Sequence, residues 1–299
     1  MAAGCPLRHY ANLDFSAWPD AARQRTRAVH QTHFRQAGDG PPLILLHPSP
    51  LSSEFMVPLV DLVADKVTAI APDTPGYGQS DPLPAAASDL VPYVHWLAGL
   101  VRKLGHSSVG LYGSATGAQI AIQFARVHPE MTRYLVLDNA VHFHADERQD
   151  ILANYFPDLS PQADGSHLQR AWEMSSGLFW YFPWYDQREQ SRVSQAAPPL
   201  HAVHATALAY LVAGVDYDMA YRAAFRNEDA ANMQQISVPT RVIRWAGGML
   251  KKYADRLDDF DWPENIRMVH CGKPVEKRFA AIREQIVELS GQTADQSPG

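Results

Sequence analysis

The chain has 299 residues, of which 46% are hydrophobic and 19% are charged, and its formal net charge is −6. This composition is typical of a globular protein with one large core and room for an inserted lid. The negative charge argues against nucleic acid or an anionic membrane surface as a partner. Two cysteines, Cys5 and Cys271, are too few for a disulfide framework, and no stretch approaches the ~18 apolar residues of a membrane span. No signal-peptide pattern opens the sequence, so we expect a cytoplasmic protein.

Strand and helix patterns alternate through the first part of the chain. Residues 1–25 are polar and interrupted by prolines, which predicts an irregular arm, and the alternation over Arg27–Arg35 predicts a half-buried antiparallel strand. Further predicted elements are strands near 43–47, 67–72 and 108–112, with helices at Leu51–Ala64 and Ser88–Leu104. Strands and helices in this order predict a doubly wound, mostly parallel sheet with helices on both faces.

A tight turn of small residues follows the strand near 108–112. Residues 108–118 read Ser-Val-Gly-Leu-Tyr-Gly-Ser-Ala-Thr-Gly-Ala, so Gly113 and Gly117 have the spacing of the nucleophile elbow, G-x-S-x-G. The middle residue of that motif sits on a strained strand-to-helix corner, and the glycines leave room for a close approach. Here the middle residue is Ala115, which has a methyl group where the attacking oxygen is expected. We predict that Ala115 lies at the bottom of a ligand pocket.

The alternating pattern stops after a helix at Ala118–Val127 and a strand at Tyr134–Asp138. From about 141 to 225 no parallel-strand run appears, and histidines and aromatic residues become frequent. We interpret residues 141–225 as a helical cap inserted into a core made of 1–140 and 226–290. The core resumes with a strand from Val238 to Trp245, a helix from about Lys251, a strand near Arg267–Cys271 and a helix at Val275–Leu289. Residues 291–299 are small and polar, which predicts a disordered tail.

Several segments together make the chain resemble the α/β-hydrolase superfamily, in particular its capped members such as epoxide hydrolases, dehalogenases and C–C hydrolases. His47-Pro48-Ser49-Pro50 resembles the oxyanion loop of that superfamily. Residues 71–81, Ala-Pro-Asp-Thr-Pro-Gly-Tyr-Gly-Gln-Ser-Asp, match its Asp-x-Pro-Gly-x-Gly-x-Ser loop. The elbow, the strand ending at Asp138 and the strand at Val238–Ile243 follow in the superfamily's order. The resemblance implies an α/β-hydrolase fold with an inserted cap.

The resemblance also implies which residues surround the pocket. The backbone N–H groups of Ser49 and Thr116 correspond to the oxyanion donors of the superfamily. The alternative is that the loop of Ser49 only packs against the core. Ligands of open parallel sheets bind at the carboxyl ends of the strands. We therefore expect a pocket that is also lined by His47, Pro48, Ser114 and Asn139 and by the cap residues Trp172, Tyr181 and Trp184.

The acid and the histidine that complete a catalytic triad in the superfamily have no counterparts at their usual places. The acid usually follows the strand that ends at Trp245, but residues 246–250 carry no carboxylate. The histidine usually follows the last strand, but residues 272–276 contain none. An acid at Asp138 or Asn139 would still have no aligned histidine to orient. We therefore predict no carboxylate–histidine pair within reach of Ala115.

A pocket with oxyanion donors can still stabilise an enolate, an alkoxide or a tetrahedral species without a nucleophilic side chain. It then needs a general base or a positioned water, and histidine suits proton transfer near neutral pH. His142, His144 and His167 lie within the predicted cap. We expect at least one of these histidines to point into the cavity above Ala115, with His167 as the first candidate.

The sequence leaves three functions open. The first is a hydrolase- or lyase-type enzyme that cleaves a small apolar or aromatic substrate without a standard triad. The second is a ligand-binding pseudoenzyme. The third is a covalent hydrolase in which Ala115 replaces the nucleophile, because members of this superfamily carry serine at the elbow or histidine in a Gly-x-His-Thr-Gly pattern.

The expected partner is a small molecule, and we expect no cofactor. His201 and His204 are three residues apart, but no third ligand stands at a useful spacing, so no metal is expected either. The aromatic run Phe179–Tyr185 is too dense to lie entirely in a core. Some of these rings are expected to face the pocket or another chain, and the alternative is that they pack the cap against the core. A homodimer is among the expected assemblies.

Overall fold

A computed structural model describes residues 6–14 and 29–294 of the chain. Its centre is an eight-stranded sheet in the order β1-β2-β4-β3-β5-β6-β7-β8. The strands are β1 (Leu7–Asp14), β2 (Val29–Ala37), β3 (Pro42–Leu46), β4 (Thr68–Pro72), β5 (Val109–Ser114), β6 (Thr132–Asp138), β7 (Thr240–Trp245) and β8 (Ile266–Cys271). β2 pairs antiparallel with β1 and β4, and the other neighbours are parallel. The predicted doubly wound, mostly parallel sheet is confirmed.

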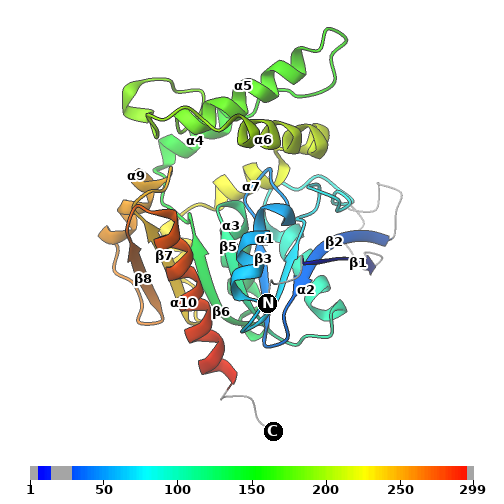
Figure 1. The fold of residues 1–299 in the computed structure, drawn as a ribbon, viewed down its shortest axis with the longest axis vertical. Helices are drawn as coiled ribbons and strands as arrows, with labels where there is room; N and C mark the ends of the chain where they lie inside the picture. Colours follow the sequence, from blue (N-terminus) through cyan, green and yellow to red (C-terminus); the bar gives the residue numbers. More distant parts are fainter. Residues whose placement is uncertain (1–5, 15–28, 295–299) are drawn as a thin grey trace.

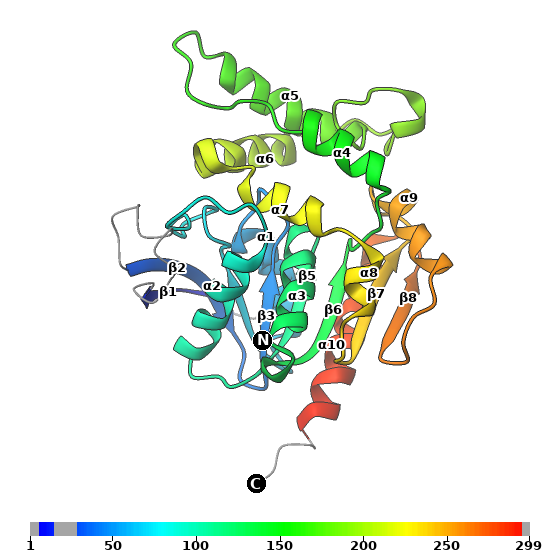
Figure 2. The ribbon, with the colours of Figure 1, turned by 180° about the vertical axis from the view of Figure 1, so that it is seen from behind.

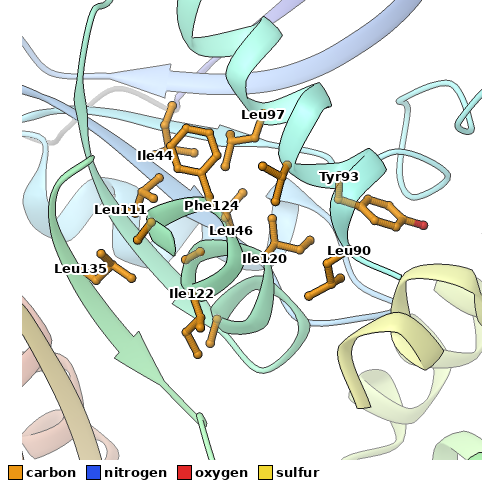
Figure 3. Packing of buried hydrophobic residues seen from close by; sticks show 14 of the residues in the cluster. Ile44, Leu46, Leu90, Tyr93, Leu97, Leu111, Ile120, Ile122, Phe124 and Leu135 are labelled. Atoms are coloured by element: carbon orange, nitrogen blue, oxygen red, sulfur yellow. The ribbon is translucent and has the colours of Figure 1, made fainter. Parts of the chain in front are cut away.

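Helices cover both faces of this sheet. α1 (Ser53–Val63) and α10 (Val275–Ala294) lie on one face (Figure 1), and α2 (Val91–Lys103), α3 (Thr116–Val127) and α8 (Ala230–Gln234) lie on the other (Figure 2). Figure 3 shows strand residues such as Ile44 and Leu111 packed against Phe124 of α3 and Leu97 of α2. All four side chains are fully buried. The strands carry apolar residues on both sides because helices cover both faces of the sheet.

The helices above the sheet belong to the segment 141–225, which we call the cap. It contains α4 (Ala145–Asn154), α5 (Ser166–Trp180), α6 (Leu200–Ala213) and α7 (Met219–Asn227), and it stands over the carboxyl ends of the parallel strands (Figure 1). The cap has an aromatic cluster of its own, in which Phe143, Tyr155 and Phe182 are buried. Its last helix, α7, packs on α3 of the core. The remaining short elements are α9 (Lys251–Ala254) and 3₁₀ turns at Pro129–Met131, Glu189–Ser191, Gly214–Asp216 and Asp255–Asp259.

Two expectations for the ends of the chain are wrong. The N-terminal arm contains strand β1, in which Ala11 and Leu13 are buried and Asn12 between them is exposed. Residues 1–5 and 15–25 of the predicted arm lie outside the described residues. Residues 291–294 of the predicted tail belong to α10, which continues to Ala294, and residues 295–299 lie outside the described residues. Ile286 and Leu289 hold this helix on the core, and nothing breaks it before its end. Of the helices in the described ranges, none has both the length and the apolar composition needed to cross a bilayer.

The β5–α3 corner has almost no free space around its glycines. A Cβ atom at Gly113 would overlap the carbonyl oxygen of Gly117, and a Cβ atom at Gly117 would overlap the carbonyl oxygen of Leu46. These atoms belong to backbone in a strand and a helix, which cannot move aside cheaply. The two glycines therefore allow α3 to start directly against β3 and β5.

We expect Gly117→Ala to lower the free energy of unfolding by roughly 1–3 kcal/mol or more, because overpacking of a rigid corner is destabilising. Urea denaturation followed by circular dichroism measures the change. The matched control is Gly291→Ala in α10, where nothing lies within 4 Å of the added Cβ. The free energy of unfolding of this control should rise by roughly 0.5–1 kcal/mol, because alanine is more favourable than glycine in a helix by about this amount. Equal stability of the two variants would contradict the close approach.

Candidate active site

Ala115 forms the corner between β5 and α3. Its φ of 49° and ψ of −113° lie in a region that residues with a side chain rarely adopt. Its N–H donates to the carbonyl oxygen of Asp138 at 3.0 Å, and its carbonyl accepts from the N–H of Gln119 at 3.1 Å. These bonds fix the strained corner on both sides. Ala115 lines a cavity of about 550 Å³ between the sheet and the cap.

The cavity brings together many of the residues predicted for the site. Ala115 shares it with the predicted residues Pro48, Ser49, Ser114, Thr116 and Asn139. Its upper walls are largely apolar and come from the cap, including Phe143, Leu178, Phe179, Phe182 and Phe225. Asn139 also has a positive φ, 53°, and its Nδ2 donates to Ser114 Oγ at 3.1 Å. The floor is thus polar and the roof apolar.

Two backbone N–H groups at the floor are available to a ligand. Thr116 is the first residue of α3, where helical N–H groups have no partner in their own helix. Within the described parts of the chain, neither the N–H of Thr116 nor that of Ser49 donates to a protein acceptor. The N-terminus of α3 also carries a partial positive charge. An oxygen with developing negative charge is the ligand that such a floor suits.

His47 supports this loop from behind and is not part of the cavity wall. Its Nε2 accepts from the N–H of Thr74 at 2.9 Å, and its Nδ1 lies 3.0 Å from the carbonyl oxygen of Pro48. Burial lowers the pKa of His47, and this pattern fits a neutral ring that donates through Nδ1. The expectation that His47 lines the pocket is therefore wrong. Both of its nitrogens are used to hold the loop of Ser49.

An arginine lies a few residues after the place where the superfamily pattern has a histidine following the last strand. Arg278 of α10 lines the cavity, and its Nε donates to Asp138 Oδ2 at 2.9 Å. Tyr112 donates its hydroxyl to the same oxygen at 2.7 Å. The guanidinium also stacks on Trp245, 5.1 Å from the ring centroid. A guanidinium is always protonated and cannot act as a base, so this pair is structural and electrostatic.

The three cap histidines lie elsewhere, and none is among the described residues that line the cavity. His144 is the N-cap of α4, and His167 accepts the N–H of Gln162 at Nδ1, 3.1 Å away, to close a turn. His142 makes a T-shaped contact with Phe260, and its Nδ1 is 3.7 Å from Asp229. The expectation that one of them points into the cavity above Ala115 is wrong. His144 and His167 instead serve their own helix end or turn, and His142 contacts groups from distant parts of the chain.

The three predicted cap aromatics also lie outside this cavity. Trp172 and Tyr181 line a separate groove of about 450 Å³, where Arg192 lies over the rings of Trp180 and Tyr181. Trp184 donates its Nε1 hydrogen to the carbonyl oxygen of Tyr155 at 2.9 Å. Their neighbours Phe179 and Phe182 provide the aromatic surface of the cavity. The aromatic run was correctly expected to divide between the pocket and other packing, but with different members in the pocket.

Glu228 is a cavity residue that sequence reasoning missed. Its Oε1 accepts from Gln119 Nε2 at 2.7 Å and from the N–H of Val141 at 3.0 Å. Asn227 orients the Gln119 amide by donating to its Oε1 at 2.9 Å. Burial raises the pKa of Glu228 from 4.5 to about 8. The carboxyl group is therefore mostly protonated at neutral pH.

The sequence carries no local signal for either missed residue. Glu228 stands in the polar run Arg226-Asn227-Glu228-Asp229, which is typical of a solvated loop. It becomes buried because α7 packs on α3, a contact between segments about 100 residues apart. Arg278 follows the position of the missing histidine by a few residues, and its role depends on α10 lying against β6.

Comparison with known proteins identifies the family of this fold. The family model described as alpha/beta hydrolase fold matches residues 41–262. An (E)-2-((N-methylformamido)methylene)succinate hydrolase of Acinetobacter baylyi is 28% identical over 110 residues, 37% of this chain and 41% of the relative. A soluble epoxide hydrolase of Corynebacterium sp. is 33% identical over 110 residues, 36% of this chain and 38% of the relative. Matches to such curated relatives span only about two fifths of their length.

Solved structures extend the likeness to the whole fold. The haloalkane dehalogenase DbeA from Bradyrhizobium elkani has a TM-score of 0.63 at 17% identity, with 97% of this chain and 99% of that chain covered. An E-2-(acetamidomethylene)succinate hydrolase has a TM-score of 0.56 at 17% identity, with 96% and 98% covered. At 17% sequence identity these similarities show a shared fold and nothing about function.

The protonated carboxyl of Glu228 has a consequence for stability. Between about pH 4.5 and pH 8 the unfolded chain releases this proton and the folded chain keeps it, so stability falls as pH rises. At about pH 4 we expect the free energy of unfolding of Glu228→Gln to be close to that of the parent protein. At about pH 8 we expect it to be higher than that of the parent protein by roughly 3–5 kcal/mol. Urea denaturation across this pH range measures the difference. The exposed Glu264→Gln is the control, and a pH-independent difference for Glu228→Gln would contradict the raised pKa.

Proposed function

The chain belongs to the α/β-hydrolase family, and from that premise we propose that it cleaves a small apolar or aromatic substrate by oxyanion stabilisation, without a covalent nucleophile. The observation that carries the proposal is the floor of the cavity, where Ala115 stands beside the unpaired N–H groups of Ser49 and Thr116. The proposed reaction is of hydrolase or lyase type. It uses water and the chain's own groups, with no cofactor.

The backbone donors would act on the oxygen of the bond to be cleaved. A carbonyl oxygen placed between the N–H groups of Ser49 and Thr116 gains negative charge as water adds to its carbon or as an adjacent bond breaks. Fixed donors stabilise that charge more than the starting carbonyl, and removal of one such donor typically costs about 2.7–4 kcal/mol in the barrier. The partial positive charge at the N-terminus of α3 acts in the same direction.

The walls of the cavity indicate the chemical class of the substrate. Phe179, Phe182 and Phe225 provide aromatic surface, whereas Arg278 is already paired with Asp138. A cavity of about 550 Å³ with this lining suits a compact molecule with an apolar or aromatic body and one polarisable oxygen. The relatives named as hydrolases of a substituted succinate and of epoxides support hydrolysis of a small organic molecule. The neutralised Arg278 favours an uncharged substrate over a dicarboxylate.

The alanine at the elbow position also favours a second candidate, a pseudoenzyme that binds a ligand of the same class without turnover. The two functions differ in one measurement. The proposed enzyme slowly hydrolyses simple aryl esters such as phenyl acetate and 4-nitrophenyl acetate. A pseudoenzyme binds phenyl ketones in the cavity but cleaves neither ester.

Two substitutions at the elbow test the proposed absence of covalent catalysis. We expect Ala115→Ser to show no stoichiometric labelling by a fluorophosphonate, because no histidine among the described cavity residues can activate its hydroxyl. Ala115→His tests the Gly-x-His-Thr-Gly pattern, and we expect it to give no burst of 4-nitrophenol. Mass spectrometry and stopped-flow absorbance provide the two readouts.

The matched control is Ala224→Ser, which places a serine on the cap wall of the same cavity. Labelling confined to Ala115→Ser, at one reagent per chain, would support the third function, a covalent hydrolase in which alanine replaced the nucleophile. A burst confined to Ala115→His would support the same conclusion for a histidine nucleophile.

A further inference from the structure

The cavity contains one carboxyl group with a free oxygen. The Glu228 side chain is 5% exposed and shares the cavity wall with Ala115 and Thr116. Its Oε1 holds both hydrogen bonds, from Gln119 Nε2 and the Val141 N–H. In the described parts of the chain Oε2 has no hydrogen-bond partner. A carboxyl group this deeply buried normally has a counter-ion or a full set of partners.

The charged groups around Glu228 do not supply a counter-ion. Arg148 of α4 donates to the backbone oxygen of Glu228 at 2.9 Å, and its charge is paired with Asp229 Oδ2 at 2.8 Å. His142 also faces Asp229. From α3 the facing group is the uncharged amide of Gln119, and from α7 it is the hydroxyl-bearing Tyr221. The surroundings therefore favour the neutral acid.

The hydrogen bonds also indicate where its proton lies. Oε1 accepts two N–H hydrogens, which is the pattern of a carbonyl oxygen. The proton of the neutral acid is then on Oε2, the oxygen without a protein partner. The burial that raises the pKa of Glu228 to about 8 keeps this proton in place at neutral pH. The Asn227–Gln119 contact fixes the amide, so that its NH₂ and not its oxygen faces the acid.

We propose that Glu228 is the proton donor of this site and transfers its Oε2 hydrogen to the departing oxygen or nitrogen of the substrate. The inference rests on the proposed function. In the hydrolysis of an ester, the oxygen of a water molecule bonds to the carbonyl carbon, and the carbon–oxygen bond of the leaving group breaks. The leaving oxygen takes the electron pair of that bond together with the Glu228 proton. The attacking water loses one proton, which returns Glu228 to its neutral form.

Other groups in the cavity are less suited to this step. Arg278 is committed to Asp138 and keeps its protons in the accessible pH range. The hydroxyl of Tyr221 lies 2.9 Å from that of Tyr155, and burial raises the pKa of Tyr221 to about 12. Neither group matches the pKa near the working pH that efficient general acids have.

The test compares two esters that differ in their need for a proton donor. Phenyl acetate releases a basic phenolate, whereas 4-nitrophenyl acetate releases a stable anion that departs without a proton. We expect Glu228→Gln to lower kcat for phenyl acetate by about 10²–10⁴-fold and to change kcat for the nitrophenyl ester far less. With the parent protein, kcat for phenyl acetate should fall as pH rises through about 8, the pKa of Glu228, and Glu228→Gln should lose this dependence. The control is Glu264→Gln, because Glu264 is exposed, and its kcat for both esters should equal that of the parent protein.

Each outcome separates this inference from the proposed function. If the parent protein cleaves both esters and Glu228→Gln lowers kcat for both equally, or changes neither kcat, the proton-donor role is overturned. The proposed function then still stands. Cleavage of neither ester by the parent protein overturns the proposed function and the donor role with it.

A second measurement needs neither catalysis nor the Glu228→Gln variant, and so tests the inference even if that variant folds poorly. The infrared spectrum of the parent protein should contain a band of a protonated carboxyl at about pH 7, where ordinary glutamates are ionised, and it should lose that band at about pH 10. Labelling glutamate with ¹³C shifts the band and identifies its residue type. Absence of the band at about pH 7 overturns the inference whatever the turnover.

Discussion

The close approach of α3 to β3 and β5 is the constraint on which the site depends. Gly113 and Gly117 permit this approach, and the chain must then turn within one residue, which places Ala115 in a strained conformation. The first residue of α3, Thr116, lines the cavity beside this turn. The strain at Ala115 and the position of its methyl group are therefore consequences of one backbone contact.

The electrostatics of the cavity follow from two buried acids with different partners. Asp138 accepts hydrogen bonds from the guanidinium of Arg278 and the hydroxyl of Tyr112, so the positive charge of Arg278 is paired with it. Glu228 has only uncharged donors and is neutral near pH 7. The cavity thus presents little net charge to a ligand. This pairing is the reason for proposing an uncharged substrate and not an ionic one.

Local sequence patterns predicted the strands and the elbow, because each depends on residues that are close in the chain. The residues at the floor of the cavity were expected from the resemblance to the α/β-hydrolase superfamily, since they come from separate loops. The histidine candidates failed for a physical reason. His144 and His167 stand at helix beginnings and turns, where nearby backbone groups take their nitrogens. Glu228 and Arg278 could not be found in this way, since their burial comes from packing of α7 on α3 and of α10 on the sheet. The N-terminal strand was missed because only Ala11 and Leu13 mark its buried side.

The methyl group of Ala115 has a consequence for acyl transfer from a substrate to acceptors other than water. A hydrolase with a serine at the elbow stores an acyl group on the enzyme between two half-reactions, and an alcohol or amine that enters at that stage can take the acyl group in place of water. The proposed mechanism has no atom at the elbow to carry the acyl group and therefore no such stage. Under that proposal an alcohol could take the acyl group only by replacing the attacking water in the single step.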